Sequence, residues 1–146
     1  MHDYVKKTYQ SKFAFGIETD DMVARYWHTL SQEFGRDNVM IVSIDKDYKQ
    51  FPALIYNYHY KHKKILDITE SQALFNFYEQ MVVGDSADNV QFFKGKGAKF
   101  AEKYFKDCKT KYQYTKEMYK LFKKQYKSKA KLKYIECYKL LKLLTN

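Results

Sequence analysis

The stretch Asn38-Val39-Met40-Ile41-Val42-Ser43-Ile44-Asp45-Lys46-Asp47 decides the fold that the sequence predicts. Its first seven residues form a run of mostly apolar, β-branched side chains, which is typical of a parallel strand buried on both faces. Such a strand requires helices on both sides of its sheet. The two aspartates follow directly, so both carboxylates project from the carboxyl end of the strand, where open α/β sheets bind ligands. The sequence therefore predicts an α/β fold with an acidic site at a strand end.

The residues on either side of this strand predict further elements of an α/β domain. Before it, apolar residues at helical spacing predict a helix that is capped by Thr19 or Asp20 and ends near Gly35. After it, residues 53–58 and 65–68 predict two more strands. We expect a partial parallel sheet flanked by helices.

The remainder of the chain predicts helices. Thr69, followed by Gln72 three residues later, forms a capping box that predicts a helix start. From Ala98 nearly to the end, apolar and aromatic residues recur at helical spacing, which favours a mainly helical region with an aromatic core over a set of base-stacking platforms. The side chains expected on the buried faces are Phe100, Ala101, Tyr104, Phe105, Tyr119, Leu121, Phe122, Tyr126, Leu132, Ile135, Leu140 and Leu143.

Length and charge favour one domain, residues 1–146, with two different parts. The chain has 146 residues, 45% of them hydrophobic, which suits one core and is too short for two ordinary domains. Residues 94–146 hold 17 lysines against 4 acidic residues, whereas residues 1–93 hold 10 basic against 13 acidic residues. A basic half suits a polyanion, because each neutralised phosphate releases counterions, although lysine runs also occur as solvated helix faces. We expect an acidic α/β part at 16–90 and a basic, DNA-binding helical part at 91–146.

Several function classes are not expected. No stretch has the apolar length of a signal peptide core or a membrane span, so we expect a soluble, cytoplasmic protein. Cys108 and Cys137 have no second pair at zinc spacing, which indicates reduced structural thiols. A histidine metal site is not expected, because the histidines are scattered: His2, His28, His59 and His62.

Three acidic groups stand at the ends of predicted elements. Converging carboxylates repel one another and are tolerated where cations lie between them. Oxygen-only clusters select Mg²⁺ or Mn²⁺, and two such ions can activate water and stabilise the leaving oxygen of a phosphodiester. Taken singly, the groups also fit helix-start acids, a turn pair or a helix cap. The candidate residues are Glu18, Asp20 and Asp21, then Asp45 and Asp47, then Asp85 and Asp88.

Taken in order, these segments resemble the 5′-3′ exonuclease and flap endonuclease family, the 5′ nucleases of bacteria and bacteriophages. Glu18-Thr19-Asp20-Asp21 resembles the family's Glu-Ala-Asp-Asp segment, and Val42-Ser43-Ile44-Asp45-Lys46-Asp47 resembles its strand followed by Ser-x-Asp-x-Asp. Gly84-Asp85-Ser86-Ala87-Asp88-Asn89 resembles its Gly-Asp-Ser-x-Asp-Asn segment. Gly95-Lys96-Gly97-Ala98-Lys99-Phe100-Ala101 resembles the Gly-x-Gly-x-Lys-x-Ala turn of its helix-three-turn-helix motif.

The resemblance implies a PIN-like nuclease core followed by a helix-three-turn-helix, and a two-metal hydrolase of DNA replication that uses Mg²⁺ or Mn²⁺. It implies that all seven acidic residues form the metal site, with Asp45, Asp47, Asp85 and Asp88 as its catalytic members. It also implies a DNA clamp with a K⁺ ion. Independently of the family, glycines let backbone N–H groups approach phosphates closely, and a following helix start adds positive potential. The clamp residues are Lys94, Gly95, Lys96, Gly97 and Lys99.

The resemblance covers residues 16–101 and lacks the family's beginning, a strand that carries an aspartate and a second aspartate before a helical arch. The 17 residues before Glu18 contain Asp3 as their only acid. Phe92 and Phe93 stand where the family has a glycine and an aliphatic residue, and Lys96 stands where it has an isoleucine. We therefore expect part of a structure-specific 5′ nuclease for duplex, flap or RNA–DNA substrates, completed by a polypeptide that supplies the N-terminal strand and arch.

Two alternatives remain open at this point. The chain could be a non-catalytic module that binds duplex DNA and derives from such a nuclease. It could also be a structural or protein-interaction helical domain, which would explain the lysine-rich and tyrosine-rich tail but not the acidic groups.

Overall fold

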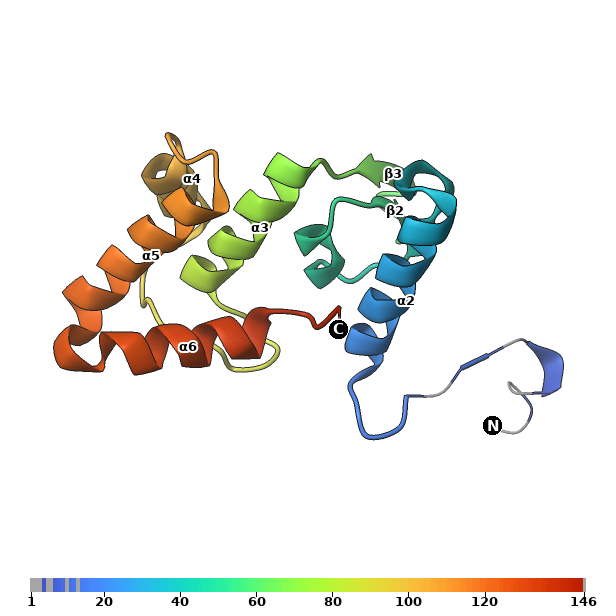
Figure 1. Cartoon of the computed structure of the whole chain (residues 1–146), viewed down its shortest axis with the longest axis horizontal. Coiled ribbons are helices and arrows are strands. Elements are labelled where there is room, and N and C mark those ends of the chain that lie inside the picture. The colour runs from blue at the N-terminus through green and yellow to red at the C-terminus, as the bar shows by residue number, and fades with distance from the viewer. Residues whose placement is uncertain (1–3, 5–6, 10, 13, 146) are drawn as a thin grey trace.

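The computed structural model describes residues 4, 7–9, 11–12 and 14–145, and within them the chain is mixed α/β (Figure 1). Three short strands form one sheet in the order β1 (Met40–Val42), β2 (Leu54–Asn57) and β3 (Lys64–Asp67). β1 pairs with β2 in parallel, with Ile41 opposite Ile55. β3 returns antiparallel to β2 after the short connection 58–63, so the sheet is mixed where a parallel one was expected. The short connection is the reason, since a parallel return needs a crossover of a dozen or more residues.

The strand that decides the fold is buried on one face only, so the expectation of burial on both faces was wrong. Ile41 points into the core, whereas Met40 and Val42 are 41% and 61% exposed. β1 is an edge strand of the sheet that the described residues form. An apolar run by itself does not tell whether a second layer covers it.

Helix α2 (Thr19–Phe34) packs Ala24 and Trp27 against the sheet side of the molecule. Its N-cap is Glu18, without a side-chain capping hydrogen bond, rather than Thr19 or Asp20 as expected. The helix ends before Gly35, which has φ 85°. Ala24 and Trp27 belong to a first core cluster whose other members are Ile41, Tyr48, Phe51, Ala53, Ile55, Ile68, Ala73 and Leu143.

After the sheet the described chain forms helices α3 (Glu70–Val83), α4 (Ala98–Phe105), α5 (Lys111–Tyr126) and α6 (Ala130–Leu141), with a non-helical stretch at 84–97 between α3 and α4. The capping box predicted at Thr69 and Gln72 is present at the start of α3, and a second one at Thr110 and Gln113 starts α5. Three single-turn 3₁₀ segments connect elements at Arg36–Asn38, Asp47–Gln50 and Lys127–Lys129, labelled η1, η2 and η3. Helix α3 lies between the sheet side and the other helices (Figure 1).

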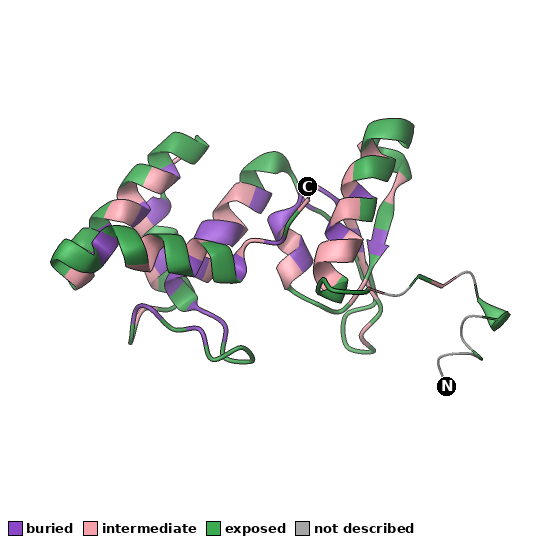
Figure 2. Ribbon diagram, turned by 60° about the horizontal axis from the view of Figure 1, so that its bottom comes forward, coloured by how far each residue is buried: buried purple, intermediate pink, exposed green. Residues whose placement is uncertain are grey.

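A second core cluster fills the space between α3, α4, α5 and α6, and it is rich in aromatic side chains as predicted. Tyr78, Phe93, Phe105 and Phe122 are among its fully buried members. Figure 2 shows these buried stripes along the inner faces of the helices. Helix α3 contributes mainly to this cluster, although the sequence placed it in the α/β part.

The buried face of α6 differs from the predicted one. Leu132 and Leu140 are 71% and 57% exposed, and Ile135 is also exposed. The helix instead buries Ala130, Cys137 and Leu141, and packs Tyr134 and Tyr138 against the same cluster. Both stripes have helical spacing, and the one that contains tyrosines faces α3 and α5, where ring-to-ring contacts extend the aromatic core.

Other expectations concern cysteines, histidines and membranes. Cys137 is buried and Cys108 half-buried, and both are free thiols as expected. His59 and His62 lie on one turn with ring centroids 5.6 Å apart, while His2 and Asp3 lie outside the described residues. None of the helices in the described part of the chain has the length and apolar character needed to cross a bilayer.

Candidate functional site

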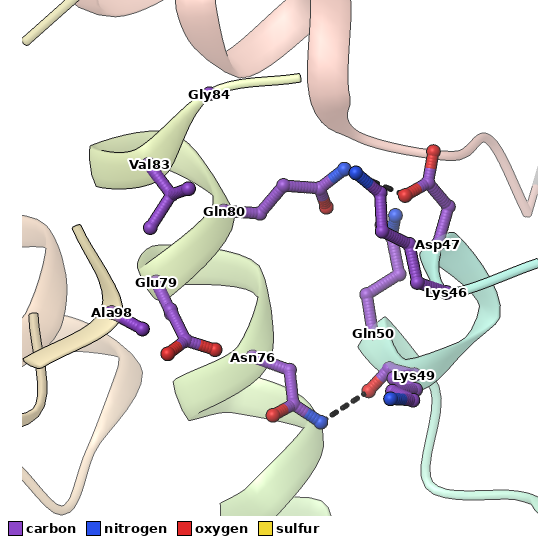
Figure 3. Close-up of a pocket in the computed structure, with 10 residues that line it drawn as sticks. All are labelled: Lys46, Asp47, Lys49, Gln50, Asn76, Glu79, Gln80, Val83, Gly84 and Ala98. Carbon is purple, nitrogen blue, oxygen red and sulfur yellow. Dashed lines mark hydrogen bonds between the residues drawn. The ribbon is translucent and has the colours of Figure 1, made fainter. Parts of the chain in front are cut away.

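Asp45 and Asp47 lie where the sequence placed them, just beyond β1, and local hydrogen bonds fix their turn. The backbone N–H of Asp45 donates to Ser43 Oγ at 3.0 Å, and the N–H of Asp47 donates to Asp45 Oδ1 at 2.9 Å. Asp47 then begins η2, and its Oδ1 accepts a hydrogen bond from Gln80 Nε2 of α3 at 2.8 Å. This last contact joins the strand end to the middle helix (Figure 3).

The acidic segment that contains Asp85 and Asp88 starts at Gly84, directly after α3, and closes into a small loop. Asp85 and Val90 exchange two backbone hydrogen bonds, of 2.8 and 2.7 Å. Gly84 has φ 81°, and a Cβ atom there would lie 2.1 Å from the carbonyl oxygen of Val90, so the loop needs glycine at this position. The loop directs the Asp85 carboxylate inward, where it is 3% exposed.

Lys46 connects the turn of Asp45 and Asp47 to Asp85. Its Nζ lies 2.9 Å from Asp85 Oδ2, while Asp85 Oδ1 accepts the backbone N–H of Ala87 at 2.8 Å. These hydrogen bonds outweigh burial and hold the pKa of Asp85 below its usual value, the bond from Lys46 contributing most. The same pairing raises the pKa of Lys46. Two segments that are about forty residues apart in sequence thus meet in one cluster of charges.

Among the described residues neither Asp45 nor Asp47 has an ion pair, and Asp47 is the more buried of the two. Its pKa is raised from 3.8 to about 6, first by burial and then by the charges of Asp45 and Asp85. Lys46 and Gln80 oppose the shift without cancelling it. A carboxyl group whose pKa is raised by burial and by neighbouring negative charges is common at functional sites. A cation bound beside it stabilises its ionised form.

The other predicted acidic residues are only partly drawn into this cluster. Asp20 acts from α2 on Tyr48, whose pKa is raised to about 12, first by burial and then by the charges of Asp20, Asp45 and Asp47. Asp21 Oδ1 instead accepts the backbone N–H of Leu144 at 2.7 Å, so it ties down the C-terminal segment.

Glu18 and Asp88 stand at the edges of their segments. Glu18 is the exposed N-cap of α2. Asp88 is exposed and directs its backbone N–H, rather than its carboxylate, toward Asp85. Within the described residues, no three His, Cys, Asp or Glu side chains converge closely enough to hold a metal ion together.

A cleft of about 260 Å³ opens beside Asp47 and is lined by η2, α3 and the first residue of α4 (Figure 3). The sequence reasoning missed its α3 wall, which consists of Asn76, Glu79 and Gln80. Asn76 Nδ2 donates to the carbonyl of Lys49 at 2.9 Å, and burial is the main cause that raises the pKa of Glu79. The signal was present, because these three are polar residues at i, i+3 and i+4 in the otherwise mostly apolar stretch 73–83 of α3.

The basic turn, residues 94–97, lies beside this cleft, because the next residue, Ala98, lines the cleft and also begins α4. Gly95 has φ 75° with open space where a Cβ would lie, and Gly97 is the N-cap of α4. Lys94 and Lys99 are exposed, whereas Lys96 folds back so that its Nζ lies 4.4 Å from the centroid of the Phe100 ring.

Phe92 and Phe93, which depart from the family pattern, anchor this turn. Both are buried against Phe122, with ring centroids 5.8 and 4.8 Å away. Tyr126 Oη donates a hydrogen bond to the carbonyl of Phe92. The aromatic pair therefore holds the turn to α5.

Comparisons with protein-family models, with curated proteins and with solved structures gave no match for this chain.

Proposed function

We propose that this chain is part of a structure-specific, metal-dependent 5′ nuclease that hydrolyses phosphodiesters of DNA or of RNA–DNA hybrids. The observation that carries the proposal is the meeting of the Asp45–Asp47 turn with Asp85, which Lys46 contacts at 2.9 Å. The raised pKa of Asp47 among these carboxylates agrees with it. If the acidic turns were independent of one another, the segments before and after α3 would not be expected to meet in one charge cluster. The ordered resemblance of residues 16–101 to the 5′ nucleases supports the same reading.

The donor chemistry of the cluster fits hard cations. Asp45, Asp47 and Asp85 offer oxygen ligands only, which Mg²⁺ and Mn²⁺ prefer. These residues would hold the ions together with Asp88 and the acidic start of α2, and Lys46 would have to release Asp85. Its side chain is 59% exposed and free to turn away. Bound there, the ions would supply an activated water and would stabilise the leaving oxygen.

The basic half would hold the nucleic acid next to this site. Lys94, Gly95 and Lys99 present backbone N–H groups and charge at the start of α4, which suits phosphate oxygens of a duplex. The same turn borders the cleft beside Asp47. A duplex gripped there would pass close to the acidic cluster, and the K⁺ ion implied by the resemblance would belong to this turn.

A partner polypeptide that supplies a further strand and the arch is part of this proposal. β1 is paired on one side only within the described residues, and its side chains Met40 and Val42 face outward. An open strand edge with exposed apolar residues is a surface on which another strand can add.

The test is cleavage of a 5′-flap substrate in Mg²⁺ or Mn²⁺, by the chain alone and together with a polypeptide that carries the strand and arch. We expect activity that EDTA abolishes and that Asp45→Asn reduces by at least about a hundredfold. Asp107→Asn, on the exposed turn after α4, is the matched control and should leave activity intact. Absence of cleavage by folded protein in every combination would refute the proposal.

A non-catalytic duplex-binding module is the second candidate, and two contacts favour it. Lys46 occupies Asp85, and the C-terminal segment occupies Asp21, so two expected ligands already have partners. This candidate predicts duplex binding that weakens with salt and with Lys99→Ala but is unchanged by Asp45→Ala. It also predicts no cleavage in any metal.

A further inference from the structure

A groove of about 470 Å³ runs between α4 and α5, and none of the residues of the acidic cluster lines it. One wall carries Lys96, Phe100 and Tyr104, which follow one another at i, i+4 and i+8 along the basic turn and α4. The other wall carries Lys120, Lys124 and Gln125 of α5, and the floor is made by Phe93 and Leu121. Among the described residues that line this groove, none is acidic.

The aromatic wall has a defined arrangement. The rings of Phe100 and Tyr104 are stacked, with centroids 5.5 Å apart and an interplanar angle of 12°. Lys96 Nζ lies over the Phe100 ring, so a positive charge stands at one end of the stack. Both rings remain half-buried, unlike the fully buried Phe105 and Phe122 of the same helices. The sequence assigned these rings to the core, but the fold leaves them partly open along the groove.

The two lysines on the opposite wall, Lys120 and Lys124, differ in their surroundings. Lys120 shares an ion pair with Glu117, with Nζ 2.6 Å from Oε1. Glu117 itself lines the neighbouring depression, where its backbone carbonyl accepts the Tyr104 hydroxyl at 3.2 Å. Tyr104 is therefore held by its hydroxyl group, and its ring is left to contact whatever occupies the groove. Lys124 is exposed one turn further along α5.

Lysines that lie across a groove from stacked aromatic rings suit one ligand class in particular. Phosphates of a nucleic acid pair with the ammonium groups, and unpaired bases stack on the rings. A duplex hides its base faces within its own stack, so it would use the lysines but not the rings. The aromatic wall therefore distinguishes a single strand from a duplex.

We propose that the α4–α5 groove is a binding site for single-stranded nucleic acid, in which bases stack on Phe100 and Tyr104 and phosphates contact Lys120 and Lys124. The site does not use the acidic cluster and does not require metal. It goes beyond the proposed cleavage activity, because it would hold a strand whether or not the chain cuts it.

The test measures fluorescence anisotropy of a labelled oligothymidylate of about twelve nucleotides, in EDTA, so that cleavage plays no part. We expect Tyr104→Leu to weaken binding about tenfold, whereas Tyr104→Phe, which keeps the ring, should stay within about twofold of the wild type. Tyr112→Leu, an exposed tyrosine of α5 outside the groove, is the matched control and should bind as the wild type does. Thermal unfolding of each variant by circular dichroism verifies that it is folded.

A second pair of variants tests the lysines without touching the core. The double variant Lys120→Gln with Lys124→Gln should reduce the slope of log K against log salt by about 1.4, since each phosphate contact on a single strand contributes about 0.7. The double variant Lys131→Gln with Lys139→Gln removes the same charge from α6 and should leave the slope nearly unchanged.

Two results would overturn the inference. One is single-strand binding that the groove variants and their controls change equally. The other is a duplex of the same length that loses as much affinity with Tyr104→Leu as the single strand does, which would make the groove a duplex surface. Failure of flap cleavage leaves these outcomes untouched, so the two proposals fail separately.

Discussion

Gln50 Oε1 accepts the backbone N–H of Leu143 at 3.1 Å, across 93 positions of sequence. The same oxygen accepts Lys142 Nζ at 3.1 Å, and the Nε2 group of Gln50 donates to the carbonyl of Leu141 at 3.1 Å. Gln50 is 6% exposed. Because Leu141 belongs to the helical core cluster and Leu143 to the sheet-side cluster, this one buried amide joins the two halves of the chain.

Replacing Gln50 by methionine should therefore destabilise the protein by about 2–4 kcal/mol, since it leaves buried backbone groups without partners. Chemical denaturation followed by circular dichroism measures the change. Gln91→Met, at an exposed position, should stay within about 0.5 kcal/mol of the wild type. An equal effect of the two substitutions would show that the amide does not join the halves.

Gly84→Ala should destabilise the protein more than Gly35→Ala does. Both glycines have φ near 80°, with extended ψ, so an added Cβ costs both of them about 1–3 kcal/mol in backbone strain. Only at Gly84 would the Cβ meet the carbonyl oxygen of Val90, at 2.1 Å. We expect an additional loss of at least about 1 kcal/mol in the free energy of unfolding, together with faster exchange of the amide hydrogens of Asp85 and Val90. Equal losses would mean that the loop opens without cost.

Asp47→Asn should stabilise the protein at neutral pH while removing a carboxylate of the proposed site. The folded protein raises the pKa of Asp47 from 3.8 to about 6, so between these values the folded state binds more protons than the unfolded state. The stability of the wild type therefore falls as pH rises through this window. The asparagine variant should exceed it by about 1 kcal/mol above pH 6, after discounting for solvent screening, with no difference below about pH 4.

Denaturation of both proteins across this pH range measures the effect, with Asp107→Asn as a control at an exposed site. Added Mn²⁺ should raise the unfolding temperature of the wild type and not that of Asp47→Asn. A variant that is less stable than the wild type at pH 7 would contradict the assignment of Asp47 as a strained carboxylate.

Lys142 should make stability rise at alkaline pH. Its pKa is lowered from 10.5 to about 8, first by burial and then by Lys111, and its Nζ lies 5.2 Å from the ring centroids of both Phe51 and Phe77. Between pH 8 and 10.5 the unfolded chain binds the extra proton, so stability increases with pH there. Relative to Lys142→Met, the wild type should gain roughly 1–3 kcal/mol from pH 7 to pH 10. Lys139→Met, on the exposed face of α6, should show no such difference.

Much of the local structure was predictable because it depends on neighbours in sequence. The capping box at Thr69 and Gln72 requires two side chains three residues apart, and the end of α2 at Gly35 requires one glycine. Spacing also gave the positions of the three strands to within a few residues. The acidic residues beyond β1 lie at a strand end for the same reason.

The exposed stripe of α6 shows that sequence spacing alone does not predict which face of a helix is buried. Leu132 and Ile135 have the spacing of a buried face, yet Cys137 and Tyr138 lie inward. Hydrophobic periodicity identifies apolar stripes on a helix, but packing against the partner helices determines which of two similar stripes is buried. The same limit applies to Phe100 and Tyr104, whose openness depends on the distance between α4 and α5.

The sequence alone determined the order of elements, the charge division of the chain and the placement of acidic residues at element ends, because propensity, capping and composition act over a few residues. Only the tertiary structure decided that β3 runs antiparallel, that Lys46 pairs with Asp85, that Asp21 binds the C-terminal segment and that Gln50 joins the two cores. Each of these depends on which distant segments share space, and that is settled by the packing of the whole chain rather than by any one stretch of it.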